Sequence, residues 1–304
     1  MERIKKAAEI LAKEGGYEQV KHMLLDVLAE EKNVIILHNL ADLLKENEDY
    51  EEALDYAKQA VAMEPKTYYP YALLGELMMR LVNDESAQPW LEKAYTLFES
   101  PVVAHNLACI YKQQQKFNEA ATYFIQSYKS EDYGLMRAVE CFVLAGDTDS
   151  AYKWIDVIKR DQERFIGEVE LGELYKSLGH YQEAAEWYAK GYQHYAHTAC
   201  WISNYLWVLH QLGHEKQVRD IRAAFLETLT TELLKLPEDA VEYEMTCEEM
   251  KEEEQRLLAD MERVRNAHLQ VGLSNDDELY IASRCFTFFC PMHDQSCGEQ
   301  EIGK

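Results

Sequence analysis

Apolar and small residues recur every three or four positions along most of the chain, which is the spacing of one face of an α-helix. The clearest stretch covers residues 165–198. Its first half places on one predicted helix face Leu171, Gly172, Tyr175 and Leu178. After a break at Gly179 and His180, a second predicted face carries Tyr181, Ala184, Ala185, Tyr188 and Gly191. The stretch therefore predicts two short helices joined by a tight turn.

The same pattern returns along the chain at intervals of roughly 34 residues. An aromatic residue after the turn and a small or branched residue three positions later set the register in four copies: Tyr17 with Val20, Tyr50 with Ala53, Phe117 with Ala120, and Tyr181 with Ala184. Three weaker copies keep only the second position, at Ala87, Ala151 and Val218. The copies begin near residues 1, 34, 68, 101, 132, 165 and 199.

In length, turn position and small residues the unit resembles the tetratricopeptide repeat (TPR), and Pro65 closes the second copy where that family usually carries proline. The resemblance covers about residues 1–232. It implies an all-α fold, a right-handed superhelical solenoid of seven helix–turn–helix hairpins. Stacking is required because one hairpin cannot bury its own apolar face.

The chain changes character after the repeats, over residues 233–275. Leu236-Pro237-Glu238-Asp239 predicts a break, and residues 240–271 then read as one long acidic helix. Its apolar residues fall seven apart at Met250, Leu257, Val264 and Val271. This spacing fits a helix that caps the last repeat or a short coiled-coil contact between two chains. We favour the cap, because an open solenoid end needs covering.

Composition limits which cellular compartment and which classes of partner are to be expected. The net charge of −24 disfavours nucleic acid and anionic membranes, and favours a basic or neutral partner. Seven cysteines, an odd number, indicate a reducing compartment rather than a disulfide framework. Neither a signal peptide nor a run of 18 apolar residues is visible in the sequence. We therefore expect a cytoplasmic protein.

The TPR resemblance implies that the first helix of each hairpin lines a concave groove. The ninth position of that helix carries Glu9, Asp42, Glu76, Cys109, Glu140, Glu173 and Trp207. Five of these seven are carboxylates, which predicts an acidic wall for lysine or arginine side chains of a bound peptide. The alternative is that the acids are paired, one turn later, with Lys45, Arg80, Lys112 and Lys176.

Asparagine also recurs in a groove-lining slot. The motif His38-Asn39-Leu40-Ala41 returns as His105-Asn106-Leu107-Ala108, and Asn204 occupies the same slot. Asparagine is a poor residue for a helix interior, so its repetition indicates a use. Its amide can pair with a peptide backbone of any sequence. It can equally tie neighbouring helices together, and the sequence leaves both interpretations open.

Residues 276–304 are predicted to be a cysteine-rich, partly disordered tail. Cys285, Cys290, His293 and Cys297 are side chains of the kinds that zinc prefers, and four would complete a tetrahedron. Their spacing matches no familiar zinc motif, so the alternative is a tail with incidental thiols. Zinc is the only cofactor that the sequence suggests.

No catalytic motif is visible, and the chain is predicted to be a non-catalytic interaction scaffold that binds a peptide or protein segment, with a basic one favoured. One alternative is a peptide-signal receptor, although repeats that begin at Met1 leave no room ahead of them for an effector domain. Another is zinc-linked assembly through the tail. The expected state is a monomer, or a dimer through the C-terminal helix.

Overall fold

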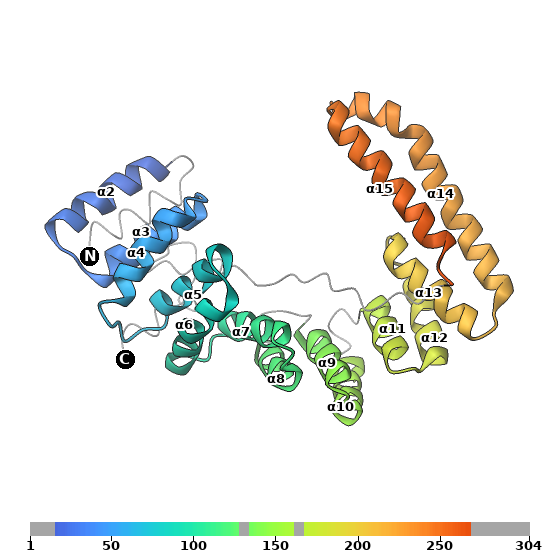
Figure 1. Ribbon diagram of the computed structural model, residues 1–304, viewed down its shortest axis with the longest axis horizontal. Helices are drawn as coiled ribbons and strands as arrows, with labels where there is room; N and C mark the ends of the chain where they lie inside the picture. The colour runs from blue at the N-terminus through green and yellow to red at the C-terminus, as the bar shows by residue number, and fades with distance from the viewer. Residues whose placement is uncertain (1–15, 128–133, 161–166, 269–304) are drawn as a thin grey trace. The chain divides into compact units, whose positions relative to one another are not determined.

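The computed structural model describes residues 16–127, 134–160 and 167–268. Within these ranges the chain forms fourteen α-helices and no strand, so the predicted all-α repeat fold is confirmed (Figure 1). Contacts divide the chain into two compact units, with the boundary after Cys141. None of the described helices is long and apolar enough to cross a membrane.

Successive helices pair as hairpins. The first helices are α3 (Val34–Glu46), α5 (Tyr69–Leu81), α7 (Pro101–Gln113), α9 (Gly134–Ala145), α11 (Glu168–Ser177) and α13 (Ala199–Gln211). The second helices are α2 (Tyr17–Glu30), α4 (Tyr50–Val61), α6 (Asp84–Leu97), α8 (Phe117–Ser127), α10 (Thr148–Arg160), α12 (Tyr181–Gly191) and α14 (Glu215–Glu242). The expected aromatic positions Tyr17, Tyr50, Phe117 and Tyr181 are thus the first residues of second helices.

The turn inside the hairpins has a shared backbone conformation. Gly146, Gly179 and Gly213 have φ of 74°, 77° and 74°, the left-handed region that glycine adopts without a steric penalty. Glu48 and Gln115 take the same conformation at the equivalent position, with φ of 65° and 59°. These turns reverse the chain within a few residues and so hold each helix pair together.

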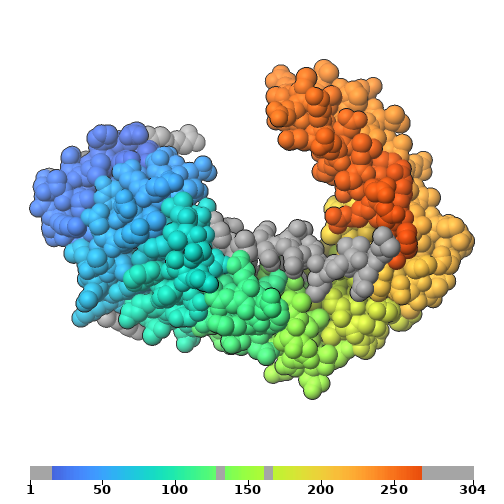
Figure 2. Space-filling view, in the orientation of Figure 1, coloured from blue at the N-terminus to red at the C-terminus, as the bar shows by residue number. Residues whose placement is uncertain are grey.

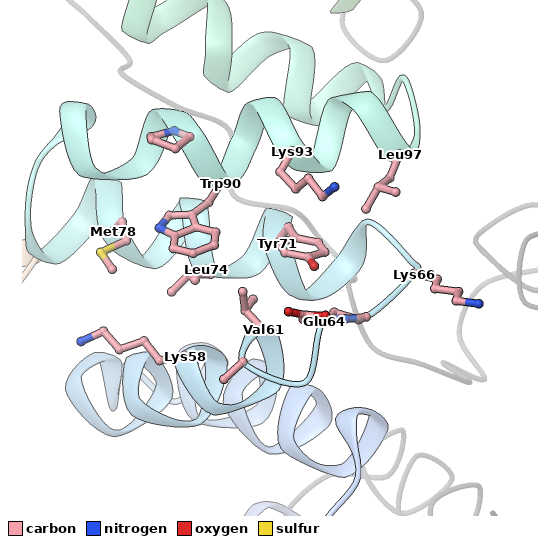
Figure 3. Close-up of a pocket in the computed structure, with 13 residues that line it drawn as sticks. Lys58, Val61, Glu64, Lys66, Tyr71, Leu74, Met78, Trp90, Lys93 and Leu97 are labelled. Carbon is pink, nitrogen blue, oxygen red and sulfur yellow. The ribbon is translucent and has the colours of Figure 1, made fainter.

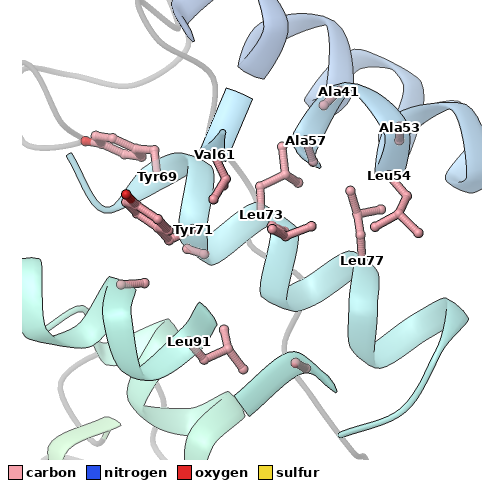
Figure 4. Close-up of a cluster of buried hydrophobic side chains, with 14 of the residues drawn as sticks. Ala41, Ala53, Leu54, Ala57, Val61, Tyr69, Tyr71, Leu73, Leu77 and Leu91 are labelled. Atoms are coloured by element: carbon pink, nitrogen blue, oxygen red, sulfur yellow. The ribbon is translucent and has the colours of Figure 1, made fainter. Parts of the chain in front are cut away.

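In the first unit, α2 to α8 pack in sequence and form one continuous body in the space-filling view (Figure 2). Its core runs from α2 to α7, and Figure 4 shows part of it around Leu73, Leu77 and Leu91. Fully burying a leucine side chain contributes about 1.5–3 kcal/mol, so this core supplies most of the stabilisation. Gly75 is essential to its close packing, because an added Cβ would lie 2.5 Å from Cγ of Leu91.

In the second unit, a last helix, α15 (Cys247–Arg265), folds back against α13 and α14. It buries Leu257, Met261 and Val264, while Leu258 stays 48% exposed. The contact covers apolar surface of the last hairpin, as a capping helix would.

The boundaries of this C-terminal region differ from the sequence prediction. α14 continues through Pro237 to Glu242, and the break falls instead at residues 243–246. Pro237 is exposed, so water can satisfy the backbone carbonyl that its missing N–H leaves free. A capping box then starts α15, with the Thr246 hydroxyl accepting from the Glu249 N–H and the Glu249 carboxylate accepting from the Thr246 N–H.

Candidate functional site

A buried charged cluster joins the first helices α3 and α5. The Asp42 and Glu76 side chains are only 5% and 0% exposed. The Lys45 Nζ lies 3.3 Å from an Asp42 carboxylate oxygen and 3.7 Å from a Glu76 oxygen. The Arg80 guanidinium lies 3.5 Å from the other Glu76 oxygen. Each carboxylate is therefore matched by a cation, and the Lys45–Glu76 pair crosses from one repeat to the next.

The environment keeps Lys45 charged despite its burial. Burial alone lowers the pKa of the ammonium, but the carboxylates of Asp42, Glu76 and Glu46 outweigh this effect and raise the pKa above its ordinary value. A buried pair of this kind is costly to break from one side, because the remaining charge has no compensation. The cluster thus fixes α3 against α5.

A second pair joins α7 to α9. The Lys112 Nζ donates to both carboxylate oxygens of Glu140 at 3.2 Å. The two side chains are 12% and 16% exposed. Cys109, on the preceding turn of α7, is a buried thiol. The contact again links the first helices of consecutive repeats.

A third cluster joins α11 to α13. The Lys176 Nζ donates to the Asn204 Oδ1 at 2.7 Å, and the Asn204 amide donates to the Glu173 carboxylate at 2.6 Å. Lys176 also lies 3.7 Å from Glu173. Burial lowers the pKa of Lys176, and Glu173 opposes this only in part. At Lys176 the neutral amide of Asn204 takes part beside the Glu173 carboxylate, whereas Lys45 meets the carboxylates of Asp42, Glu76 and Glu46.

We refer to these three clusters together as the inter-repeat polar contacts: Asp42–Lys45–Glu76–Arg80, Lys112–Glu140 and Glu173–Lys176–Asn204. They use four of the predicted groove carboxylates and one of the three predicted asparagines. The geometry corresponds to the alternative in which the acids are paired with lysine and arginine. A role in peptide binding remains a prediction for these residues.

The remaining predicted site residues are also mostly buried. Asn39 is 5% exposed on α3 and Asn106 is 2% exposed on α7. Trp207 is 7% exposed, meets the Tyr181 ring edge to face at 5.3 Å and has the Lys176 ammonium 5.8 Å from its ring. Among the predicted residues that the structure describes, Glu140 and Glu173 keep the most exposure, at 16% and 21% of their side chains.

The predicted zinc ligands lie outside the described residues, as does Glu9. Within the ranges that the structure describes, no group of three histidine, cysteine or acidic side chains could hold a metal ion.

A feature that the sequence analysis missed is a cleft in the first unit, formed by α4, α5 and α6 (Figure 3). Its volume is about 1220 Å³. Val61, Tyr71 and Leu74 line it from α4 and α5, and Trp90 and Leu97 from α6. The rings of Tyr71 and Trp90 are nearly parallel, with an angle of 16° between their planes and 6.4 Å between their centroids. The walls are thus apolar and aromatic.

The rim of this cleft is basic. Lys58, Lys66 and Lys93 all border it and all are exposed, while Glu64 is the single carboxylate among the described residues that line it. The spacing Trp90, Lys93, Leu97 places these three residues on one helix face, which is a signal that the sequence carried. It was overlooked because the TPR resemblance directs attention to the first helices, whereas Lys58, Trp90 and Lys93 lie on second helices.

Comparison with known proteins supports the repeat assignment. The family model described as tetratricopeptide repeat matches residues 35–63 and 102–130, and a second one of the same description matches residues 169–193. A TPR repeat-containing protein of Methanocaldococcus jannaschii is 28% identical over 144 residues, which is 46% of this chain. The match spans only 25% of that relative's length.

Among solved structures, a tetratricopeptide repeat protein from Parabacteroides merdae has a TM-score of 0.53 and 16% sequence identity. The likeness covers 84% of this chain and 98% of the other, and at this identity it concerns the fold alone. The matched repeats, the curated relative and the shared fold agree with the stacked hairpins described above. The chain thus carries tetratricopeptide repeats, and its fold is that of a solenoid built from them.

Proposed function

We propose that this chain is a non-catalytic scaffold that holds a segment of another protein. TPR domains generally serve as interaction modules rather than as enzymes. The observation that carries the proposal is the stacking of consecutive TPR hairpins, with buried polar contacts between their first helices. A surface held in this way is ordered before it binds, so association costs little additional conformational entropy.

The net charge of −24 supports a basic partner through long-range attraction. The predicted groove carboxylates differ in how well they support a basic partner. Asp42 and Glu76 are buried and matched by cations, so a basic peptide would have to displace Lys45 or Arg80. Of the predicted carboxylates within the described ranges, Glu140 and Glu173 are the two that a basic segment could still reach.

An affinity experiment tests the scaffold directly. The full chain is immobilised and exposed to lysate at about 50 and 200 mM salt, beside a control column that carries an unrelated protein of similar net charge. Proteins retained only by this chain are identified, purified and titrated against it in solution. Saturable binding of at least one purified protein supports the proposal. Retention on both columns alike, with no saturable binding, contradicts it.

A variant pair tests the basic character of the partner. Replacing Glu140 and Glu173 by glutamine should lower the affinity for a basic segment. The binding that remains should depend less on salt concentration. The matched control replaces Glu248 and Glu252, exposed acids of α15, and removes the same charge elsewhere. Equal binding by both variants contradicts a role for Glu140 and Glu173.

A further inference from the structure

The cleft formed by α4, α5 and α6 has a basic rim, although the chain as a whole is strongly acidic. The chain carries 55 acidic and 31 basic residues, yet three lysines and one glutamate border this hollow. Among the described residues, Lys58, Lys66 and Lys93 take part in no ion pair, whereas Lys45, Lys112 and Lys176 are all occupied by inter-repeat partners. The three rim ammonium groups are therefore free to meet a ligand.

The interior of the cleft suits an apolar side chain. Val61 and Leu74 are buried at its floor, while the half-buried Trp90 and the 38% exposed Leu97 form one wall. Trp90 and Tyr71 lie beside each other in the lining, with their ring centroids 6.4 Å apart (Figure 3). Leu97 is one of the few large apolar side chains left exposed in this unit, and covering it would remove apolar surface from water.

The backbone fixes the position of the rim. Glu64 has φ of 52°, and its N–H donates to the Val61 carbonyl at 2.9 Å, which ends α4 with a tight turn. This turn leads directly to Lys66. Lys58 and Lys93 project from helices that pack on α5. The three charges are thus set at separate points around the same opening before any ligand arrives.

We propose that this cleft is a docking site for an acidic segment of a partner protein, which packs one large apolar side chain against Tyr71, Trp90 and Leu97. Carboxylates on either side of this apolar residue pair with Lys58, Lys66 and Lys93. The inference rests on the proposed scaffold function, and it specifies the chemistry of one partner, an acidic segment with a large apolar residue. Charge complementarity selects the acidic segment, because a basic one meets three like charges at the rim.

Among the described rim residues, Glu64 is the one acidic group, so its carboxylate repels an acidic ligand. Its removal should strengthen binding, while reversal of the lysines should weaken it. Two changes of opposite sign at one opening cannot both arise from a general loss of folding. Lys58, Glu64, Lys66 and Lys93 are exposed, so their replacement leaves the core intact.

The test selects random 12-residue peptides on the intact chain at about 50 mM salt, where surface charges are little screened. Enriched peptides are synthesised with a fluorescent label and titrated by fluorescence anisotropy. The cleft variant carries Lys58→Glu, Lys66→Glu and Lys93→Glu. Its control carries Lys216→Glu, Lys235→Glu and Lys251→Glu on exposed positions of α14 and α15, with an identical change in net charge.

We expect enriched peptides with aspartate or glutamate around one large apolar residue. Their affinity should fall at least tenfold in the cleft variant, change less than twofold in the control variant, and rise about twofold or more in Glu64→Gln. Replacing the apolar residue of the peptide by serine should also reduce affinity at least tenfold.

Peptides that bind both lysine variants equally would overturn the docking site and leave the scaffold function standing. Enrichment of basic peptides, or of none, would likewise overturn it. The scaffold function itself fails only if the affinity experiment with lysate also yields no saturable partner.

Discussion

The Asn204 side chain joins Lys176 to the next hairpin, accepting a hydrogen bond from the lysine Nζ at 2.7 Å. The same amide donates to Glu173 at 2.6 Å. One neutral side chain on α13 thus satisfies both members of an ion pair on α11. Asparagine suits this position because its amide offers a donor and an acceptor at once.

Replacing Asn204 by alanine should therefore act on stability. Asn204 is 1% exposed, and its loss would leave Lys176 and Glu173 each short of one buried partner. We expect a decrease of about 2–3 kcal/mol in the free energy of unfolding, measured by urea denaturation. Affinity for a bound protein segment, measured on folded protein, should change little. Intact stability with weakened binding would instead assign this asparagine to a ligand backbone.

The cluster around Glu76 predicts a large difference between two acids near one lysine. Glu76 and Glu46 both lie within 4 Å of Lys45, at 3.7 and 3.0 Å, but their side chains are 0% and 61% exposed. Glu76→Ala should cost about 3–5 kcal/mol, because it leaves buried cations uncompensated. Glu46→Ala should cost less than about 1 kcal/mol. Similar losses of unfolding free energy would mean that Glu76 does not fix α3 to α5.

His105 predicts a specific pH dependence. It is buried on α7, and burial together with the Arg137 charge lowers its pKa to about 4. The unfolded chain binds a proton near pH 6.5 while the folded chain does not, so stability should fall as pH decreases from about 6.5 to 4. The total contribution is about 3 kcal/mol.

His105→Leu should remove that slope, which urea denaturation at several pH values would show as a smaller loss of stability on acidification. Replacement of the exposed His214 is the matched control. An unchanged pH profile in His105→Leu would mean that His105 takes up its proton equally well in the folded chain.

Replacing Gly75 by alanine should cause a steric clash that costs more stability than the higher helix propensity of alanine returns. Alanine would favour the helix by about 1 kcal/mol, but its Cβ would lie 2.5 Å from Cγ of Leu91. We expect Gly75→Ala to lower the unfolding free energy by a net 1–3 kcal/mol, on the order typical of overpacked cores. In a Leu91→Ala background the same change should cost much less. Equal costs in both backgrounds would show that α6 shifts to make room.

Much of the fold follows from local signals that the sequence displays. Tyr17, Tyr50, Phe117 and Tyr181 mark the starts of second helices. Three of these aromatic residues contact the next repeat, where Tyr17 meets Asp49, Tyr50 meets Arg80 and Tyr181 meets Trp207. The third copy matches the repeat pattern weakly, and its turn differs from that of the other copies. Val82 stands where the other described hairpins have a left-handed residue, and its φ of −120° avoids the strain that a β-branched side chain would meet there.

The C-terminal region was predicted less well, because proline was read as a break. A proline removes one backbone hydrogen bond and crowds the carbonyl four residues earlier, but the helix continues past Pro237, which is exposed so that water can reach the freed carbonyl. The true start of α15 was visible as Thr246 followed by Glu249, the pattern of a capping box.

The candidate site could be predicted only in part. Position in the repeat assigns Asp42, Glu76 and Asn204 to first helices, where the structure has them, but it could not show whether each meets a ligand or a neighbouring lysine. That choice depends on distances between repeats. The cleft beside Trp90 depends on three helices at once, so its depth is not visible in any single stretch of sequence.

Amide hydrogen exchange on the full chain, with and without a purified protein segment bound, tests the scaffold most directly. Added protection should appear without covalent change to either protein, and for an acidic segment it should centre on residues 58–66 and 89–97. Protection confined to α3, α7 and α13 would return recognition to the predicted groove. No protection at any saturating concentration of a retained protein would contradict the scaffold itself.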